Sequence, residues 1–228
     1  MTTLDDLKKS RSASKAKVTK LVNKVKPLLE LTNLDASRKA PLIKTLIDDL
    51  DEALKQFQAA HEAYVEQLFE EDGEAANEDK YEEDVESNYW SAKELYPEFL
   101  QKLTVYNNAV AIFPNQHAAY EDSINKLKTT VSHCESVLND AKDESKVVPS
   151  LTFETALKDL AGHVENIQLE KSKYSAVQKN MGHPGDASET VLNFDMKAQL
   201  DNASNIRKEL ESNVSKLATK ESQKWEQR

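Results

Sequence analysis

The chain has 228 residues, of which 31% are charged and only four are glycine, and its formal net charge is −10. This composition is typical of long helices and predicts an all-α protein, while the single cysteine, Cys134, excludes an intramolecular disulfide and any multi-cysteine metal site within one chain. No apolar run approaches the roughly 20 residues of a membrane span, and the N-terminus lacks an apolar signal core, so we expect a cytoplasmic protein.

Two helices are predicted in the first third of the chain. The first runs from about Leu4 into the low thirties, where a heptad stripe is formed by Leu4, Leu7, Arg11, Ser14, Val18, Leu21, Val25 and Leu28. The second, residues 42–68, has apolar or amphipathic positions at alternating steps of four and three. The preceding residues contain two candidate N-caps, Asp35 and Ser37, and Pro41 suits a first helical turn.

A third helix is predicted over about residues 80–112, on an apolar stripe that includes several aromatic residues. Pro97 should kink it and Pro114 should end it, because proline lacks the backbone N–H that a helix interior uses. A fourth helix then starts near Tyr120, and a fifth covers about residues 153–178.

The second half of the sequence repeats the pattern of the first. Adding 110 to the apolar positions of the second helix gives those of the fifth, and offsets of 113 and 111 relate the first helix to the fourth and the third to a sixth. A proline-bearing first loop and a glycine-bearing second loop also recur in order. We predict an elongated antiparallel helical bundle of two tandem, coiled-coil-like three-helix units, residues 1–114 and 115–228, that divides near residues 113–117. A single irregular bundle is the alternative.

Charge is distributed unevenly between two segments. Residues 1–30 carry eight basic and three acidic side chains, a net charge of +5, whereas residues 66–86 carry eleven acidic side chains and one lysine, a net charge of −10. A basic amphipathic helix can bind anionic lipid or nucleic acid by neutralising phosphates, and a solvated helix face is the plainer interpretation. The candidate anion or lipid contacts are Lys8, Lys9, Arg11, Lys15, Lys17, Lys20 and Lys24.

Motifs that would identify an enzyme are missing from the sequence. None of the five histidines follows a glutamate at the spacing of a di-iron bundle, and there is no phosphate-binding loop, nucleophile elbow or dinucleotide fingerprint. Cys134 and His61 lie on apolar stripes, which predicts a buried small residue and a locally satisfied histidine at the bundle edge. We expect no catalytic residues, metal or cofactor. Trp90 lies just off the third stripe, which makes it a candidate partner contact.

Two stretches, KKSRSASKAKVTKLVNKVKPLLE and FQAAHEAYVEQLFEEDGEAANEDKYEEDVESNYW, carry a resemblance to a known family. Together they resemble the uncharacterised helical domain of Pao/BEL retrotransposon Gag-type polyproteins, over about residues 1–112. The resemblance implies a non-enzymatic structural protein that self-associates, and it offers no binding residues to carry over. The chain lacks the cysteine-histidine knuckles and the aspartic protease motif of those polyproteins.

From the sequence we therefore predict a Gag-like, non-catalytic helical scaffold that acts through self-association or a helical protein partner, without a small-molecule substrate. The alternative is a peripheral membrane or nucleic-acid-binding module that uses the basic N-terminal helix. Binding to liposomes or RNA as a function of salt separates the two, because phosphate-driven affinity falls steeply with ionic strength.

Overall fold

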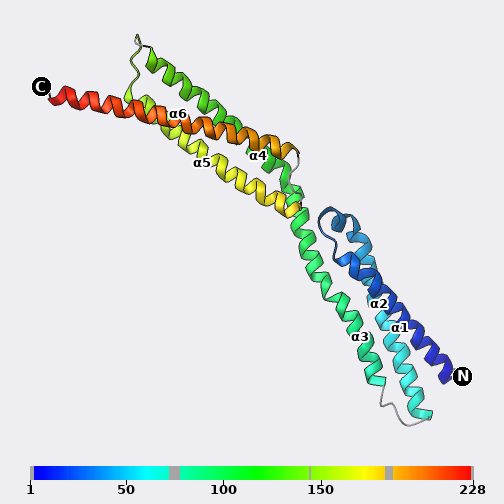
Figure 1. The fold of residues 1–228 in the computed structure, drawn as a ribbon. Helices are drawn as coiled ribbons and strands as arrows, with labels where there is room; N and C mark the ends of the chain where they lie inside the picture. Colours follow the sequence, from blue (N-terminus) through cyan, green and yellow to red (C-terminus); the bar gives the residue numbers. More distant parts are fainter. Residues whose placement is uncertain (1–2, 72–77, 144, 183–186, 227–228) are drawn as a thin grey trace. The chain divides into compact units, whose positions relative to one another are not determined.

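The computed structural model describes residues 3–71, 78–143, 145–182 and 187–226, and their regular secondary structure is entirely α-helical (Figure 1). The predicted all-α class is thereby confirmed. The helices are α1 (Leu4–Leu29), α2 (Asn33–Glu71), α3 (Glu78–Lys93), α4 (Leu95–Lys142), α5 (Ser150–Met181) and α6 (Ala187–Glu226). In the described part of the chain, no helix combines the length and the apolar character needed to cross a membrane.

Helix α1 is fixed at its start by a capping box. The Thr3 side chain accepts a hydrogen bond from the backbone of Asp6, and the Asp6 carboxylate accepts one from the backbone of Thr3, so two otherwise unpaired N–H groups are satisfied. Two residues after the internal Pro27 the helix ends at Leu29. Its buried apolar side chains are Val18, Val22, Val25 and Leu29.

Helix α2 begins earlier than expected. It starts at Asn33, so the predicted caps Asp35 and Ser37 lie inside the helix, and Pro41 is an interior residue instead of a first-turn residue. Asn33 adopts a φ of 56°, a left-handed conformation that asparagine tolerates better than most residues and that redirects the chain between α1 and α2. Pro41 is exposed, and its missing N–H leaves the carbonyl of Ser37, four residues earlier, without the usual helical hydrogen bond.

The third predicted helix is divided in two. The break lies at Glu94, between α3 and α4, and Pro97 occupies the first turn of α4, where its missing N–H has no intrahelical role. The predicted stop at Pro114 is wrong, because α4 continues through this residue to Lys142. Phe113, directly before Pro114, packs against the unit 2 core, and Tyr120 is buried in that core, so packing within unit 2 offsets the lost hydrogen bond.

The chain divides into two compact units, Met1–Asn108 (unit 1) and Ala109–Arg228 (unit 2). The division falls within α4, so no loop separates the two units. It lies a few residues before the predicted boundary at 113–117. In unit 1, α1, α2, α3 and the beginning of α4 enclose one core, in which α1 and α3 both contact α2 (Figure 1). In unit 2, the remainder of α4 packs with α5 and α6 around a second core.

The two cores use equivalent positions. Residue pairs related by the sequence offsets of 110, 113 and 111 are buried in both units, which places the apolar stripes as the sequence indicates. The pairs are Ile43 and Phe153, Leu50 and Leu160, Phe57 and Ile167, Tyr64 and Tyr174, Val18 and Val131, Val25 and Leu138, Val85 and Met196, Ala92 and Ala203, and Phe99 and Leu210.

Candidate protein-binding site

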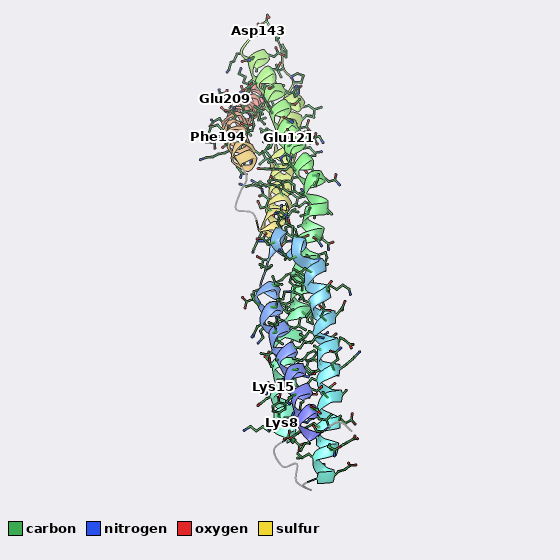
Figure 2. All side chains as sticks on the ribbon, turned by 90° about the vertical axis from the view of Figure 1, so that its right-hand side faces the viewer. Lys8, Lys15, Glu121, Asp143, Phe194 and Glu209 are labelled. Atoms are coloured by element: carbon green, nitrogen blue, oxygen red, sulfur yellow. The ribbon has the colours of Figure 1, made fainter. Side chains whose placement is uncertain are left out.

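Three aromatic side chains of the described residues are more than half exposed: Phe69, Trp90 and Phe194. Trp90, on α3, is 51% exposed, and its ring packs edge-on against Tyr89 with the centroids 5.0 Å apart. Neither Phe69 nor Phe194 has a ring contact with another described aromatic side chain. Figure 2 shows Phe194 on α6, with its side chain pointing away from the ribbon. Trp90 is therefore the exposed aromatic residue with a fixed support.

The support of Trp90 is a polar network that joins α3 to α2. The Tyr89 hydroxyl donates a hydrogen bond of 2.8 Å to the Asp51 carboxylate, and Lys93 donates to both oxygens of that carboxylate at 2.6 and 2.5 Å. Burial, together with the hydrogen bond to Asp51, raises the pKa of Tyr89 to about 12, so the phenol is neutral and remains a donor. This network fixes the position of the Tyr89 ring, against which the Trp90 ring packs.

Acidic side chains surround Trp90 on the outer surface of α3. At 100° per residue, Glu83 and Glu86 lie within about 40° of Trp90 around the axis of α3. Glu94 directly follows the end of α3, and its backbone N–H donates a hydrogen bond of 2.9 Å to the Trp90 carbonyl. Glu86 accepts a hydrogen bond of 2.7 Å from Gln58, whereas Glu83 and Glu94 are exposed and have no ion-pair partner among the described residues. We call Trp90 and these three glutamates the Trp90 face. It combines an aromatic ring with carboxylates, which is a chemistry that attracts cations.

The seven predicted anion contacts on α1 do not act as one set. Arg11 is only 5% exposed and forms an ion pair with Glu78, so it is not available to an external anion, and its assignment as a surface contact needs correction. Its guanidinium lies over two rings, 3.9 Å from the centroid of Tyr64 and 4.2 Å from that of Tyr81. Its Nε atom has no hydrogen-bond partner within the described residues.

The six lysines among the predicted anion contacts divide between two sides of α1. Lys15 is half-buried, with its ammonium 3.9 Å from the centroid of Tyr81, and it shares a flank with exposed Lys8 (Figure 2). The other four are exposed and lie within about 80° of one another on the side opposite the buried stripe. We call these four residues the lysine face: Lys9, Lys17, Lys20 and Lys24.

The lysine face is only lightly engaged within its own unit. Lys17 donates a hydrogen bond of 3.0 Å to Gln56, and Lys9 lies 3.8 Å from Asp5. Lys20 and Lys24 have no ion-pair partner in the described part of the chain. The apolar stripe of α1 is buried in the unit 1 core. A partner that binds this helix therefore meets positive charge but no exposed apolar side.

His61 is more deeply buried than the sequence indicated. Its ring is stacked with those of Phe57 and Tyr81, at centroid distances of 5.6 and 6.2 Å, and Nε2 lies 3.7 Å from the Glu82 carboxylate. Nδ1 has no hydrogen-bond partner within the described residues, so the predicted local satisfaction is incomplete. No group of three or more potential ligand side chains able to hold a metal ion occurs among those residues.

Unit 2 places Cys134 as predicted. The side chain is buried, its thiol donates a weak hydrogen bond of 3.7 Å to the Ala156 carbonyl, and burial raises the pKa of the thiol. This environment disfavours the thiolate, which is the nucleophilic form of cysteine.

A shallow groove of about 460 Å³ lies between α4 and α5 in unit 2. It is lined by Lys126, Lys158, Asp159, Gly162, His163 and Asn166. Lys126 is already paired with Asp122 at 2.7 Å, and Asp159 contributes a further negative charge. The mixed charges leave no strong preference for an anion or a cation, so this groove is a weaker candidate site than the Trp90 face.

The heptad spacing of α1 indicated that Arg11 is buried, although its charge suggested an exposed anion contact. Arg11 occupies a heptad position of α1, which predicts burial, although arginine is ordinarily exposed. Glu78 supplies the compensating charge from the acidic segment, and residues 72–77 of that segment lie outside the described residues. Spacing along α1 could identify the buried position, but only the fold identifies its partner.

Comparison of the chain with protein-family models, curated proteins and solved structures found no match. The resemblance to the Gag-type helical domain of Pao/BEL elements therefore stays a prediction that rests on residues 1–112 of the sequence.

Proposed function

We propose that this chain is a non-catalytic helical assembly protein that self-associates through the Trp90 face. The observation that carries the proposal is the exposed indole of Trp90, which packs edge-on against the Tyr89 ring, and Tyr89 is in turn hydrogen-bonded to Asp51. Tryptophan is enriched among the residues that dominate binding energy in protein interfaces. A side chain that is already ordered before binding loses little conformational entropy when a partner covers it.

A Gag-like, retroelement-derived role is one setting for such a protein, and it depends on the sequence resemblance alone. The assembly proposal itself does not require that origin, because it rests on the surface of α3. A helical partner other than a second copy is the nearest competing occupant of the Trp90 face.

The peripheral membrane or nucleic-acid-binding alternative is favoured by a different observation, the lysine face of α1. Four exposed lysines on one side of a helix can neutralise phosphates. Insertion into a bilayer would need an exposed apolar side, however, and that side of α1 packs in the core through Val18, Val22 and Val25. Only an electrostatic contact is therefore open to α1 in the folded unit.

Sedimentation velocity from 1 to about 200 μM, a range chosen to bracket micromolar affinities, tests the proposal. Wild type should form oligomers as concentration rises, and Trp90→Ala should weaken association by at least about tenfold, as expected for an interface anchor. Phe194→Ala is the matched control, since it also removes an exposed aromatic side chain. A wild type that stays monomeric throughout would refute self-association, and liposome or RNA binding that depends on the lysine face would then support the alternative.

A further inference from the structure

We infer that the Trp90 face of one copy binds the lysine face on α1 of a second copy, which gives a head-to-tail contact. This inference rests on the proposed self-association and adds the identity of the surface that covers Trp90. It concerns two sets of residues in unit 1. One is Trp90 with Glu83 and Glu86 on α3 and Glu94 directly after it, and the other is Lys9, Lys17, Lys20 and Lys24 on α1.

Both surfaces are exposed within a single copy, so neither covers the other. Trp90 is 51% exposed, and the four lysines are exposed on the side of α1 that faces away from its buried stripe. Glu83 and Glu94 on one face, and Lys20 and Lys24 on the other, have no ion-pair partners among the described residues. A second copy can pair the two unmatched sets of charges at once.

The chemistry of this contact already occurs inside unit 1. On its inner side, α3 places the Tyr81 ring under two cations of α1, Arg11 at 4.2 Å and Lys15 at 3.9 Å, and it pairs Glu78 with Arg11. The outer side of α3 offers the same two elements, an aromatic ring and carboxylates. Lysine side chains can cover an indole with their aliphatic stems while the ammonium groups reach neighbouring carboxylates.

Charge argues against the symmetric alternative, in which the Trp90 face of one copy meets the same face of another. That arrangement would bring two sets of glutamates together, and like charges facing each other across an interface oppose binding. Helix α3 has two lysines: Lys93 is committed to Asp51, and Lys80 lies ten residues before Trp90, so it can offset at most one of the three glutamates. A contact between different surfaces instead leaves one unused surface at each end of the dimer, so further copies can add.

The experiment uses two variants of the full chain that each lose a different surface. Trp90→Ala keeps the lysine face, and Lys20→Glu/Lys24→Glu keeps the Trp90 face. Lys216→Glu/Lys220→Glu is the matched control, because it makes the same charge change at the same spacing on exposed positions of α6. Thermal unfolding followed by circular dichroism verifies that every variant is folded.

Sedimentation velocity at low salt should show that each variant alone associates at least tenfold more weakly than wild type. The α6 control should associate at least as strongly as wild type. An equimolar mixture of the two variants should recover association, but it should stop at a one-to-one dimer, since each copy has only one intact surface.

Three outcomes would overturn the inference. If Lys20→Glu/Lys24→Glu associates as wild type does while Trp90→Ala does not, the Trp90 face has another occupant and the proposed function survives. If both variants are impaired but their mixture stays monomeric, the Trp90 face and the lysine face do not bind each other. If the α6 control is impaired as strongly as Lys20→Glu/Lys24→Glu, net charge and not the lysine face governs association. A monomeric wild type would refute the proposed function itself.

Discussion

Replacing Arg11 with isoleucine isolates the energetic role of the buried ion pair in unit 1. The matched position in unit 2 at the offset of 113 is Ile124, which is buried at 6% exposure, so the three-helix arrangement accepts isoleucine there. In unit 1 the substitution leaves Glu78, whose side chain is 17% exposed, without its cation. It also removes the guanidinium from the rings of Tyr64 and Tyr81.

The expected loss follows from these contacts. Removing one partner of a buried ion pair costs about 3–5 kcal/mol, and each cation–π contact contributes about 0.5–2 kcal/mol. The two energies overlap in part, because the same guanidinium makes both kinds of contact. The apolar side chain recovers some of this, so Arg11→Ile should lower the free energy of unfolding by about 4 kcal/mol. The double variant Arg11→Ile/Glu78→Leu should recover most of the loss, because replacing both ions by apolar groups is often neutral or stabilising.

Urea unfolding followed by Trp90 fluorescence measures the effect in unit 1. The sequence has two tryptophans, so a Trp225→Phe background leaves Trp90 as the single reporter. With an m-value of about 2 kcal/mol/M, the single variant should shift the unfolding midpoint by about 2 M. Lys15→Met is the control, since half-buried Lys15 contacts one ring and should cost about 1 kcal/mol or less. An Arg11→Ile variant as stable as wild type, or a double variant no better than the single, would refute this reasoning.

Three further predictions concern Tyr89, Cys134 and the two units. The raised pKa of Tyr89 means that its neutral form stabilises the fold below pH 10 and that this contribution is lost between about pH 10 and 12, so alkaline unfolding should be less steep in Tyr89→Phe than in wild type. Cys134 should react with a thiol reagent at least tenfold more slowly in the native chain than in urea, and equal rates would contradict its burial. A fragment of residues 1–114 contains all of unit 1 and should be helical and melt cooperatively, whereas an unfolded fragment beside a stable full chain would indicate a single interlocked fold.

The apolar stripes were predictable from the sequence because burial of a helix follows from spacing along that helix. Leu50, Phe57 and Leu160 are fully buried at heptad positions, and recurrence between the halves at fixed offsets identifies the same positions in both cores. The stripe does not give the depth of burial at every position: Leu54 and its counterpart Val164 are only partly buried against their cores. That depth depends on where the neighbouring helices lie.

Helix ends were less predictable because the prolines gave a local signal that packing overrides. Pro114 predicted the end of a helix, yet α4 continues through it. The break predicted at Pro97 lies at Glu94, three residues before the proline. A proline removes one hydrogen bond, whereas the packing of Phe113 and Tyr120 in the unit 2 core stabilises the helix around Pro114. The exposure of Trp90, by contrast, was indicated by its position off the stripe, although the supporting network through Asp51 was not.

The two units share a pattern of burial but differ in the chemistry at matched positions. Where unit 1 has Arg11 and Tyr81, unit 2 has Ile124 and Leu192, so apolar side chains are sufficient to build the core. The buried ion pair of unit 1 is therefore not needed for folding as such. Its directional contacts, Arg11 to Glu78 and to the tyrosine rings, fix how α3 lies against α1. The orientation of α3 in turn determines where Trp90, Glu83 and Glu94 are presented. The polar chemistry that distinguishes unit 1 is thus concentrated on α3, whose inner side pairs with α1 of the same copy and whose outer side carries the Trp90 face that we propose binds α1 of a second copy.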